Sequence, residues 1–161
     1  MIKIVPLAGI APDAVETLLD AAFGADRFGR TAYKLRAGTQ AVPHLSFAAL
    51  DGDTLVGTMQ CWPVRIGAAR MTLVGPVAVA PVVQRGGIGR LLMTHLIEAA
   101  GDAPMMMIGD PEYYSRFFGF SAEVTVAWEL PGPVERHRLL ARNVEAGLSG
   151  AVEPDPLAWA A

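Results

Sequence analysis

The sequence predicts a single α/β domain over residues 1–161, with a mixed and mostly antiparallel sheet. Strand-like segments at residues 45–50, 55–66 and 73–79 follow one another with short connections, which favours an antiparallel meander. A helical pattern at residues 88–100 then separates two apolar strand segments, as in a right-handed crossover between parallel strands. Hydrophobic residues make up 52% of the chain and charged residues 18%, so one well-buried domain is expected.

The N-terminal part predicts a short strand and one clear helix. Residues Ile2 to Val5 form the expected strand, which Pro6 closes. From Pro12 to Phe23 apolar residues recur at helical spacing, and Gly24 suits the position after the last turn. Residues 26–36 predict a second short helix, which Gly29 weakens. Its basic residues are expected on a solvated face; they are Arg27, Arg30, Lys34 and Arg36.

The middle of the chain predicts two strands of a hairpin. Residues 45–50 and 55–66 are joined by Asp51-Gly52-Asp53, a sequence typical of a tight turn. Gly57 and Pro63 mark irregular points in the longer strand. Cys61 lies in that strand with no base placed beside it by sequence, so we expect a buried thiol that packs as a small hydrophobe.

The C-terminal half predicts a buried helix followed by shorter elements. The helix at residues 88–100 is apolar on nearly every side, and His95 is expected to be a packing residue in it. The further elements expected are a strand at residues 105–109, a short helix at 110–117 stopped by Gly119, and strands at 122–130 and 138–142. No element is expected from Gly147 onward.

Composition argues against several classes of protein. The net charge of −3 and the pI of about 5.5 give no basic footprint for nucleic acid. One cysteine leaves no internal disulfide and no cysteine-rich metal site, so no metal is expected. The N-terminus lacks the features of a signal peptide, and no apolar run reaches the length of a membrane span. We therefore expect a cytoplasmic monomer or homodimer that binds neither nucleic acid nor membrane.

The most informative stretch is a glycine-rich turn between a strand and a helix. The apolar run from Leu73 to Val79 ends before Pro81, and the turn Gln84-Arg85-Gly86-Gly87-Ile88-Gly89 leads into the helix. The first N–H groups of a helix have no acceptor in the chain, and the helix dipole favours negative charge beside them. Glycines let a bulky anion approach the backbone. The stretch therefore predicts a phosphate or pyrophosphate site.

The residues exclude two common phosphate motifs. A P-loop requires Gly-Lys-Ser/Thr, whereas Gly89 is followed by Arg90. A dinucleotide fingerprint requires G-x-G-x-x-G, a spacing that Gly86, Gly87 and Gly89 do not have. The pattern that fits is Gln/Arg-x-x-Gly-x-Gly/Ala, with Gln84 in its first position. Preceded by GPVAVAP, this stretch resembles the acetyl-CoA motif of the GNAT superfamily of N-acetyltransferases.

A second segment strengthens this resemblance. The family carries a tyrosine in a short helix with Gly-Phe at its end, and residues 109–120 read GDPEYYSRFFGF. Many members place the tyrosine four residues before the glycine, where this chain has Ser115. Tyr114 and Tyr113 lie five and six residues before Gly119, so the choice between them stays open. The resemblance covers nearly the whole chain and is strongest from residue 45 to residue 120.

The resemblance implies a GNAT-like twisted sheet with helices on both faces and a splayed central strand pair. In that family the pantetheine arm lies in the gap and pairs with strand backbone, as an added strand would. Pro76 agrees with a bulged or unpaired strand at this point, because proline cannot donate to a sheet ladder. The implied cofactor contacts are Val77, Ala78, Val79, Gln84, Arg85, Gly86, Gly87, Ile88, Gly89 and Arg90.

The implied activity is direct transfer of an acetyl group from acetyl-CoA to the amine of a small molecule or peptide. Tyr114, with Tyr113 second, is expected to protonate the departing sulfur, although both rings could instead only pack against the core. The general base stays unassigned, because His44, Asp110 and Glu112 each also suit a surface or capping role. Residues 26–36 match helices that flank the acceptor in the family, which is the alternative to a solvated basic face.

Two other functions also fit the glycine turn. A CoA-binding regulatory or interaction module would keep the turn but would lack a working base or an open acceptor cleft. A nucleotide-binding α/β protein would bind NAD or ATP about as well as CoA. Release of the CoA thiol with a panel of amines distinguishes an enzyme from both.

Overall fold

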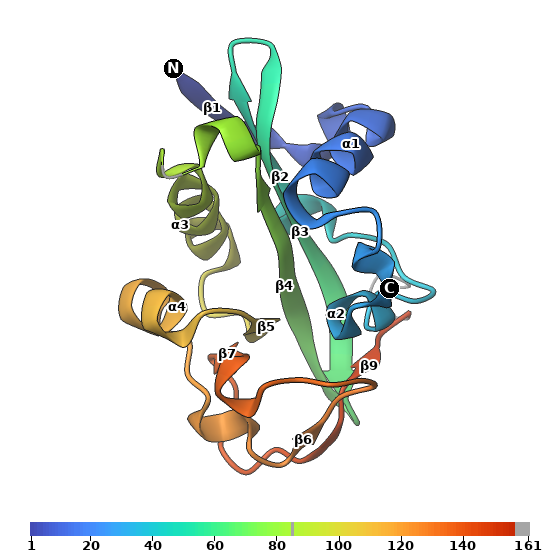
Figure 1. The fold of residues 1–161 in the computed structure, drawn as a ribbon. Helices are drawn as coiled ribbons and strands as arrows, with labels where there is room; N and C mark the ends of the chain where they lie inside the picture. The colour runs from blue at the N-terminus through green and yellow to red at the C-terminus, as the bar shows by residue number, and fades with distance from the viewer. Residues whose placement is uncertain (85, 157–161) are drawn as a thin grey trace. The chain divides into compact units, whose positions relative to one another are not determined.

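A computed structural model describes residues 1–84 and 86–156 (Figure 1). The chain forms a mixed, mostly antiparallel sheet with strand order β1-β2-β3-β4-β5-β7, and β9 pairs with β3. The α/β fold class expected from the sequence is confirmed. The chain divides into two compact units, each assembled from three segments. Unit 1 comprises residues 1–28, 41–61 and 76–101, and unit 2 comprises residues 29–40, 62–75 and 102 onward.

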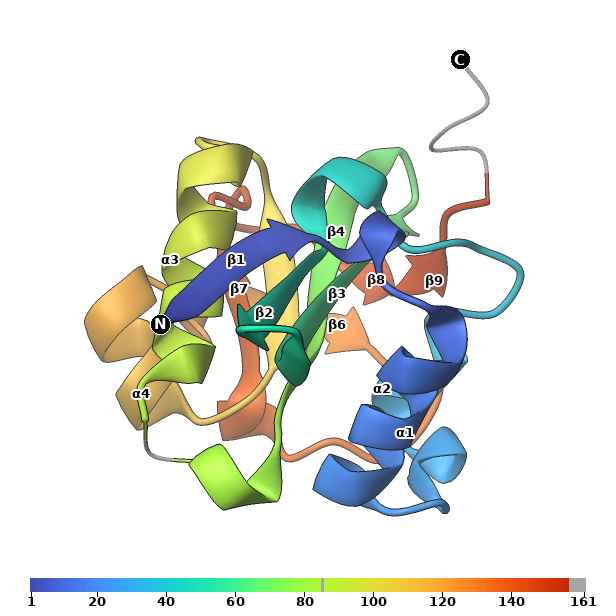
Figure 2. The same ribbon diagram turned by 90° about the horizontal axis from the view of Figure 1, so that it is seen from above.

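Unit 1 places two helices on opposite sides of antiparallel strands (Figures 1 and 2). Its elements are β1 (Ile2–Pro6), α1 (Pro12–Phe23), β2 (Phe47–Asp51), α3 (Ile88–Ala100) and the 3-10 helices Leu7–Gly9, Pro43–Leu45 and Pro81–Val83. It also contains residues 54–61 of β3 (Thr54–Ile66) and residues 76–79 of β4 (Ala69–Val79). β1 pairs with β2 and β2 with β3, with a register shift between Ala49 and Leu50.

Helix α1 follows the sequence pattern closely. Pro12 occupies the first turn, where its missing N–H costs no helical hydrogen bond. Val15, Leu18 and Leu19 are buried on one face, and the first and last of these pack with Ala78 of β4 in one apolar cluster. Burying each of these larger side chains contributes about 1.5–3 kcal/mol. This burial fixes the end of β4 against α1.

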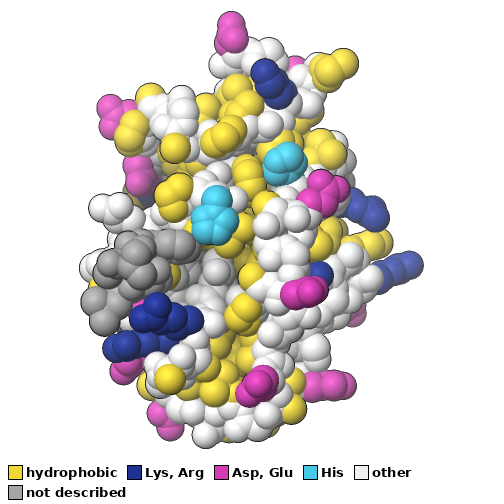
Figure 3. Space-filling view, turned by 180° about the vertical axis from the view of Figure 1, so that it is seen from behind, with side chains coloured by type: hydrophobic (Ala, Val, Ile, Leu, Met, Phe, Trp, Pro, Cys, Tyr) yellow, Lys and Arg dark blue, Asp and Glu magenta, His cyan; other side chains and the backbone are white. Residues whose placement is uncertain are grey.

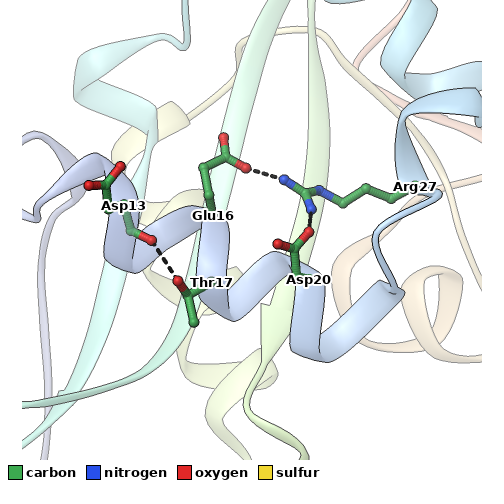
Figure 4. Close-up of polar contacts among 5 residues, drawn as sticks. All are labelled: Asp13, Glu16, Thr17, Asp20 and Arg27. Carbon is green, nitrogen blue, oxygen red and sulfur yellow. Dashed lines mark hydrogen bonds and ion pairs between the residues drawn. The ribbon is translucent and has the colours of Figure 1, made fainter.

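One expectation about the basic residues near α1 is wrong. Arg27 was expected on a solvated face, yet its side chain is only 1% exposed. Its guanidinium forms ion pairs with Glu16 and Asp20, which lie one turn apart on α1 (Figure 4). It also lies 4.3 Å from the centre of the Phe28 ring. Two carboxylates at i and i+4 share one helix face, and this pairing makes burial of the cation tolerable.

Unit 2 contains the parallel pair of strands predicted from the sequence. Its elements are α2 (Thr31–Lys34), β5 (Met105–Ile108), α4 (Pro111–Phe118), β6 (Trp128–Glu129), β7 (Leu139–Arg142), β8 (Gly150–Ala151) and β9 (Glu153–Pro154), with residues 62–66 of β3 and 69–75 of β4. β4 pairs with β5 in parallel, β5 pairs with β7 antiparallel, and α2 and α4 lie on opposite sides of these strands (Figures 1 and 2). Together the two units show helices on both faces of their strands, as expected.

Three segments of unit 2 or its border differ from expectation. The helix predicted at residues 26–36 is a 3-10 turn, Arg27–Gly29, followed by the four-residue α2. The strand predicted at residues 122–130 is a 3-10 turn, Glu123–Thr125, followed by the two-residue β6. The Thr125 hydroxyl bonds the carbonyls of Ala122 and Leu139, so this segment satisfies its polar groups locally instead of in a ladder. Beyond Gly147, where no element was expected, β9 pairs with β3.

Charged and apolar side chains are interspersed on the face shown in Figure 3. Cys61 is fully buried, in agreement with its expected packing role. Among the residues that the structure describes, no helix has the length and apolar character needed to cross a membrane.

Candidate functional site

The glycine turn of unit 1 joins β4 to α3. Gly87 is the N-cap residue of α3 at a φ of 80°, a left-handed conformation that glycine adopts without steric penalty. No side chain caps α3, and its first turn contains no acidic residue. The amides of Ile88 and Gly89 are first-turn N–H groups, for which the helix itself supplies no acceptor. This geometry suits an anion.

Gln84 holds the turn against the end of β4. Its Nε2 donates to the carbonyl of Val79 at 3.3 Å. The amide of Val83 donates to Ala80 at 3.0 Å and that of Gly86 to Val83 at 3.2 Å. A Cβ on Gly86 would lie 3.1 Å from the Val83 carbonyl, so a side chain there would crowd the turn. Gln84 therefore has a structural contact that the sequence did not reveal.

Helix α3 approaches β3 closely at Gly57. A Cβ at this position would lie 2.8 Å from Ile88 Cγ2, 3.2 Å from Leu92 Cδ1 and 3.3 Å from the Ala78 carbonyl. The first turn of α3 therefore packs so closely on β3 that position 57 has no room for a side chain. By contrast, a Cβ on Gly89 would meet its nearest neighbour at 3.8 Å, an ordinary contact. Packing alone therefore does not require glycine at position 89.

The other predicted cofactor residues are placed as follows. Val77 and Val79 are half-buried, whereas Ala78 is buried against α1. Arg90 is exposed on α3. Arg85 lies outside the described residues. The structure thus brings the end of β4, the turn and the start of α3 together in unit 1.

In unit 2, β4 and β5 pair over a short distance. Their register joins Thr72 with Met105 and Leu73 with Met106. β5 continues to Ile108, and its pairing with β7 extends over that whole length. Gly75, two residues after the last pair, has a φ of 128°. This register agrees with the expectation that β4 and β5 separate after Leu73.

Helix α4 holds the two candidate tyrosines. Asp110 is its N-cap residue and accepts a hydrogen bond from the amide of Glu112 at 3.0 Å. Gly119 ends the helix at a φ of 74°. The rings of Tyr113 and Tyr114 meet edge to face with their centres 4.9 Å apart. Both rings are half-buried, so each retains an accessible part.

The surroundings of Tyr114 raise the pKa of its phenol. Its ring lies over the backbone of Gly109, where an added Cβ would be 2.8 Å from Cε2. Burial, with smaller contributions from Tyr113 and Asp110, raises the pKa of Tyr114 to about 12, while the Arg138 guanidinium acts in the opposite direction. The phenol is therefore protonated at neutral pH and can donate a hydrogen bond.

Unit 2 contains a hollow with a volume of about 600 Å³ that was not expected from the sequence. Its lining comes from residues 29–32, the last residue of β5 and the loop at residues 133–138. The charged side chains in this lining are Arg30, Glu135 and Arg138. Arg30 was expected on a solvated face or beside an acceptor, whereas Glu135 and Arg138 gave no signal in sequence because nothing local marks their position.

Unit 1 contains a second, smaller hollow of about 300 Å³ beneath the start of α1. Most of its lining is apolar, including Leu7, Ile10 and Val15. Ser46 and Gln60 add polar groups, but the Ser46 hydroxyl already accepts a hydrogen bond from the amide of Cys61 at 3.1 Å. Its chemistry is less distinctive than that of the hollow in unit 2.

None of the three candidate bases is singled out by its contacts. The Asp110 carboxylate caps α4, and Glu112 is exposed in the first turn of the same helix. His44 is exposed in a 3-10 helix of unit 1. His95 packs edge to face on Phe47 at 4.7 Å, in agreement with its expected packing role.

Comparison with known proteins identifies the family. Residues 9–120 match the Acetyltransferase (GNAT) family. The chain belongs to this family. No curated protein shows significant similarity to the sequence. The family assignment confirms the resemblance drawn from the glycine turn and the tyrosine helix.

Several solved GNAT structures share the fold. A GNAT family acetyltransferase from Brucella melitensis in complex with acetyl-CoA is 26% identical, with a TM-score of 0.64, and the match covers 96% of each chain. The GNAT family N-acetyltransferase YhbS from Escherichia coli in complex with CoA is 24% identical, with a TM-score of 0.68, and the match covers 96% of this chain and 89% of that chain. Arabidopsis thaliana Naa50, bound to a bisubstrate analogue, is 14% identical with a TM-score of 0.52, over 87% of this chain and 95% of that one.

Within residues 1–84 and 86–156, no group of three or more His, Cys, Asp or Glu residues is arranged to hold a metal ion.

Proposed function

We propose that this protein transfers an acetyl group from acetyl-CoA directly to an acceptor amine. The observation that carries the proposal is the uncapped glycine turn at the start of α3, in a chain that belongs to the GNAT acetyltransferases. The Brucella melitensis structure, which contains acetyl-CoA, supports the choice of donor. The alternatives are a CoA-binding module without turnover and a nucleotide-binding protein.

The residues of unit 1 would bind the donor. First-turn amides of α3, from Ile88 and Gly89, would bond the pyrophosphate, and Gly87 would let it approach the backbone. Val77 to Val79 would offer strand backbone to the pantetheine arm. A backbone N–H near Val79 would bond the oxyanion that forms as the amine adds to the thioester.

Tyr114 would assist the departure of sulfur. In the reaction the new C–N bond forms, the C–S bond breaks, and the amine loses a proton to a base or to water. A thiol has a pKa of about 8.5, whereas the pKa of Tyr114 is about 12. Complete proton transfer to the sulfur would therefore be uphill by about 5 kcal/mol at 1.36 kcal/mol per unit. We propose that Tyr114 donates a hydrogen bond to the sulfur, with Tyr113 as the second candidate.

Ligand-dependent stability tests the donor. A ligand present at a hundredfold excess over its Kd adds about 2.7 kcal/mol to the free energy of unfolding. Acetyl-CoA should raise the melting temperature, and NAD and ATP should raise it much less. Equal shifts by all three would favour the nucleotide-binding alternative over the acetyltransferase.

A matched pair of variants at Gly87 tests the position of the pyrophosphate. Asparagine and aspartate have nearly the same shape and both tolerate a positive φ, so they differ mainly in charge. A like charge about 4 Å away costs about 1 kcal/mol in water and about 4 kcal/mol at a protein surface. Gly87→Asp should therefore bind acetyl-CoA at least about fivefold more weakly than Gly87→Asn. Equal affinities would place the pyrophosphate elsewhere.

Turnover separates an enzyme from a binding module. Acetyl-CoA and a broad panel of amines are incubated with the protein, and the released thiol is measured. The proposal expects release that depends on both amine and protein. Tight binding of acetyl-CoA with no release for any amine would favour the module.

A further inference from the structure

The hollow in unit 2 has a charge pattern that suggests what it binds. We propose that it holds the carboxylate of the acceptor, so that the preferred acceptors are amino acids or other amines that carry a carboxylate. This inference rests on the proposed function and names its substrate class. It uses only residues of unit 2.

Two guanidinium groups and one carboxylate belong to the lining of the hollow. Arg30 comes from the segment before α2, and Glu135 and Arg138 come from the loop before β7. The three side chains carry a net charge of +1, which favours binding of an anionic group. The arginine fork matches a carboxylate in shape and can bond both of its oxygens.

The loop that carries Arg138 is fixed at its backbone. The carbonyl of Arg138 accepts a hydrogen bond from the amide of Gly109 at 3.0 Å, directly after β5. Its own amide donates to the carbonyl of Glu135 at 2.9 Å. The Thr31 hydroxyl, in the segment that follows Arg30, donates to the carbonyl of Pro133 at 2.6 Å. These contacts hold the two basic walls of the hollow in place.

Tyr114 is not a lining residue of the hollow, but Gly109 connects it to Arg138, which is. Burial is the main influence on the pKa of Tyr114, and the positive charge of Arg138 lowers the pKa of the same phenol. Gly109, bonded to Arg138, lies beneath the Tyr114 ring. A carboxylate held by Arg138 would thus keep the rest of the acceptor near Tyr114.

Size and the remaining charge favour an amino acid over a bare anion. The volume of about 600 Å³ lies within the range of about 300–1,000 Å³ that small-molecule pockets occupy. The Glu135 carboxylate, which also lies 3.5 Å from His137 Nε2, would accept a hydrogen bond from the ammonium of an entering zwitterion, while the guanidiniums would bind its carboxylate. Ile108 provides apolar surface at the end of β5. A zwitterion with a side chain matches all three features.

The experiment compares each amino acid with its carboxamide, which keeps the amine and side chain but lacks the negative charge. Steady-state release of CoA thiol gives kcat and KM for wild type, Arg138→Gln and Arg30→Gln. Arg116→Gln is the matched control, because Arg116 is exposed on α4 and lies outside the hollow. Calorimetric titration of the same compounds in the presence of CoA measures their affinity without requiring turnover. The melting temperature of each variant shows whether it is folded.

Loss of one charged hydrogen bond weakens binding by about 10- to 150-fold, and the exposure of Arg138 favours the low end of this range. Arg138→Gln should lower kcat/KM for the amino acid about tenfold, mainly through KM, and change that for the carboxamide less than threefold. Calorimetry should show the same selective loss, and Arg116→Gln should show neither.

Equal losses for amino acid and carboxamide would overturn carboxylate recognition, as would no loss in either arginine variant. If calorimetry shows Arg138-dependent binding of amino acids but no amine is acetylated, the hollow is supported and the proposed acetyl transfer fails. If amines are acetylated without any preference for a carboxylate, acetyl transfer stands and this inference fails.

Discussion

Alanine at position 57 tests whether the close approach of α3 to β3 is required. In the wild type a Cβ at this position would be 2.8 Å from Ile88 Cγ2, which is 0.6 Å short of an ordinary 3.4 Å contact. That methyl belongs to a β-branched side chain with one strongly preferred χ1 rotamer in a helix, so it cannot rotate away cheaply. The Ala78 carbonyl, at 3.3 Å, is backbone and is equally fixed. The start of α3 must therefore move.

Overpacking of this kind typically costs about 1–3 kcal/mol. In a domain of this size, each kcal/mol lowers the melting temperature by about 2–4 °C, so we expect a fall of about 2–12 °C for Gly57→Ala. The shift of the first turn of α3 should also weaken acetyl-CoA binding, because that turn carries the amides proposed to bind the pyrophosphate.

Thermal unfolding by circular dichroism measures the first effect, and calorimetric titration with acetyl-CoA measures the second. Gly9→Ala is the matched control: Gly9 also lies in unit 1, has no atom within 4 Å of its ideal Cβ and does not require a positive φ. Its melting temperature should stay within about 2 °C of wild type. If Gly57→Ala melts within 1 °C of wild type (on the order of 0.5 kcal/mol), the reasoning about close packing is wrong.

The remaining predictions concern Tyr114 and Arg27. Tyr114→Phe should lower kcat by less than about a hundredfold and leave acetyl-CoA affinity within about twofold, since the phenol is a weak acid; an unchanged kcat, or a selective loss in Tyr113→Phe, would argue against this role. Because the folded pKa of Tyr114 is raised from 10.0 to about 12, its neutral form stabilises the fold fully below pH 10.0, and this contribution is lost as pH rises to about 12. Urea unfolding between these pH values should show about 1–3 kcal/mol more loss for wild type than for Tyr114→Phe, and parallel losses would contradict the raised pKa. Arg27→Met should reduce the free energy of unfolding by about 1–3 kcal/mol, whereas Arg116→Met, at an exposed position, should change it by less than about 0.5 kcal/mol.

The elements with strong local signals could be predicted from the sequence. Helix α3 begins and ends where the pattern placed it, at Ile88 and Ala100, because an apolar helical period and flanking glycines mark both ends. Helix α1 has the same kind of signal in Pro12 and Gly24. The glycine turn indicated an anion site because its chemistry depends on residues close in sequence.

The features that escaped prediction depend on partners far apart in the chain. β9 has two residues, too few to show a period, and it forms by pairing with β3. The hollow of unit 2 joins segments such as those of Thr31 and Pro133, which are 102 residues apart. The burial of Arg27 depends on two carboxylates of α1, and nothing in the sequence around Arg27 indicates that it pairs with them. Local pattern contains no information on such pairings.

The ring of Tyr114 lying over Gly109 has a consequence for how this sequence can vary through evolution. Any side chain at position 109 would meet Tyr114 Cε2 at 2.8 Å and Cδ2 at 2.9 Å. The two positions are therefore coupled: a large ring at 114 opposes even alanine at 109, whereas a small residue at 114 removes the two shortest contacts and leaves only Met107 Cε, at 3.1 Å. Substitution at 109 should be accepted only after, or together with, loss of the ring, so we expect changes at these two positions to occur together.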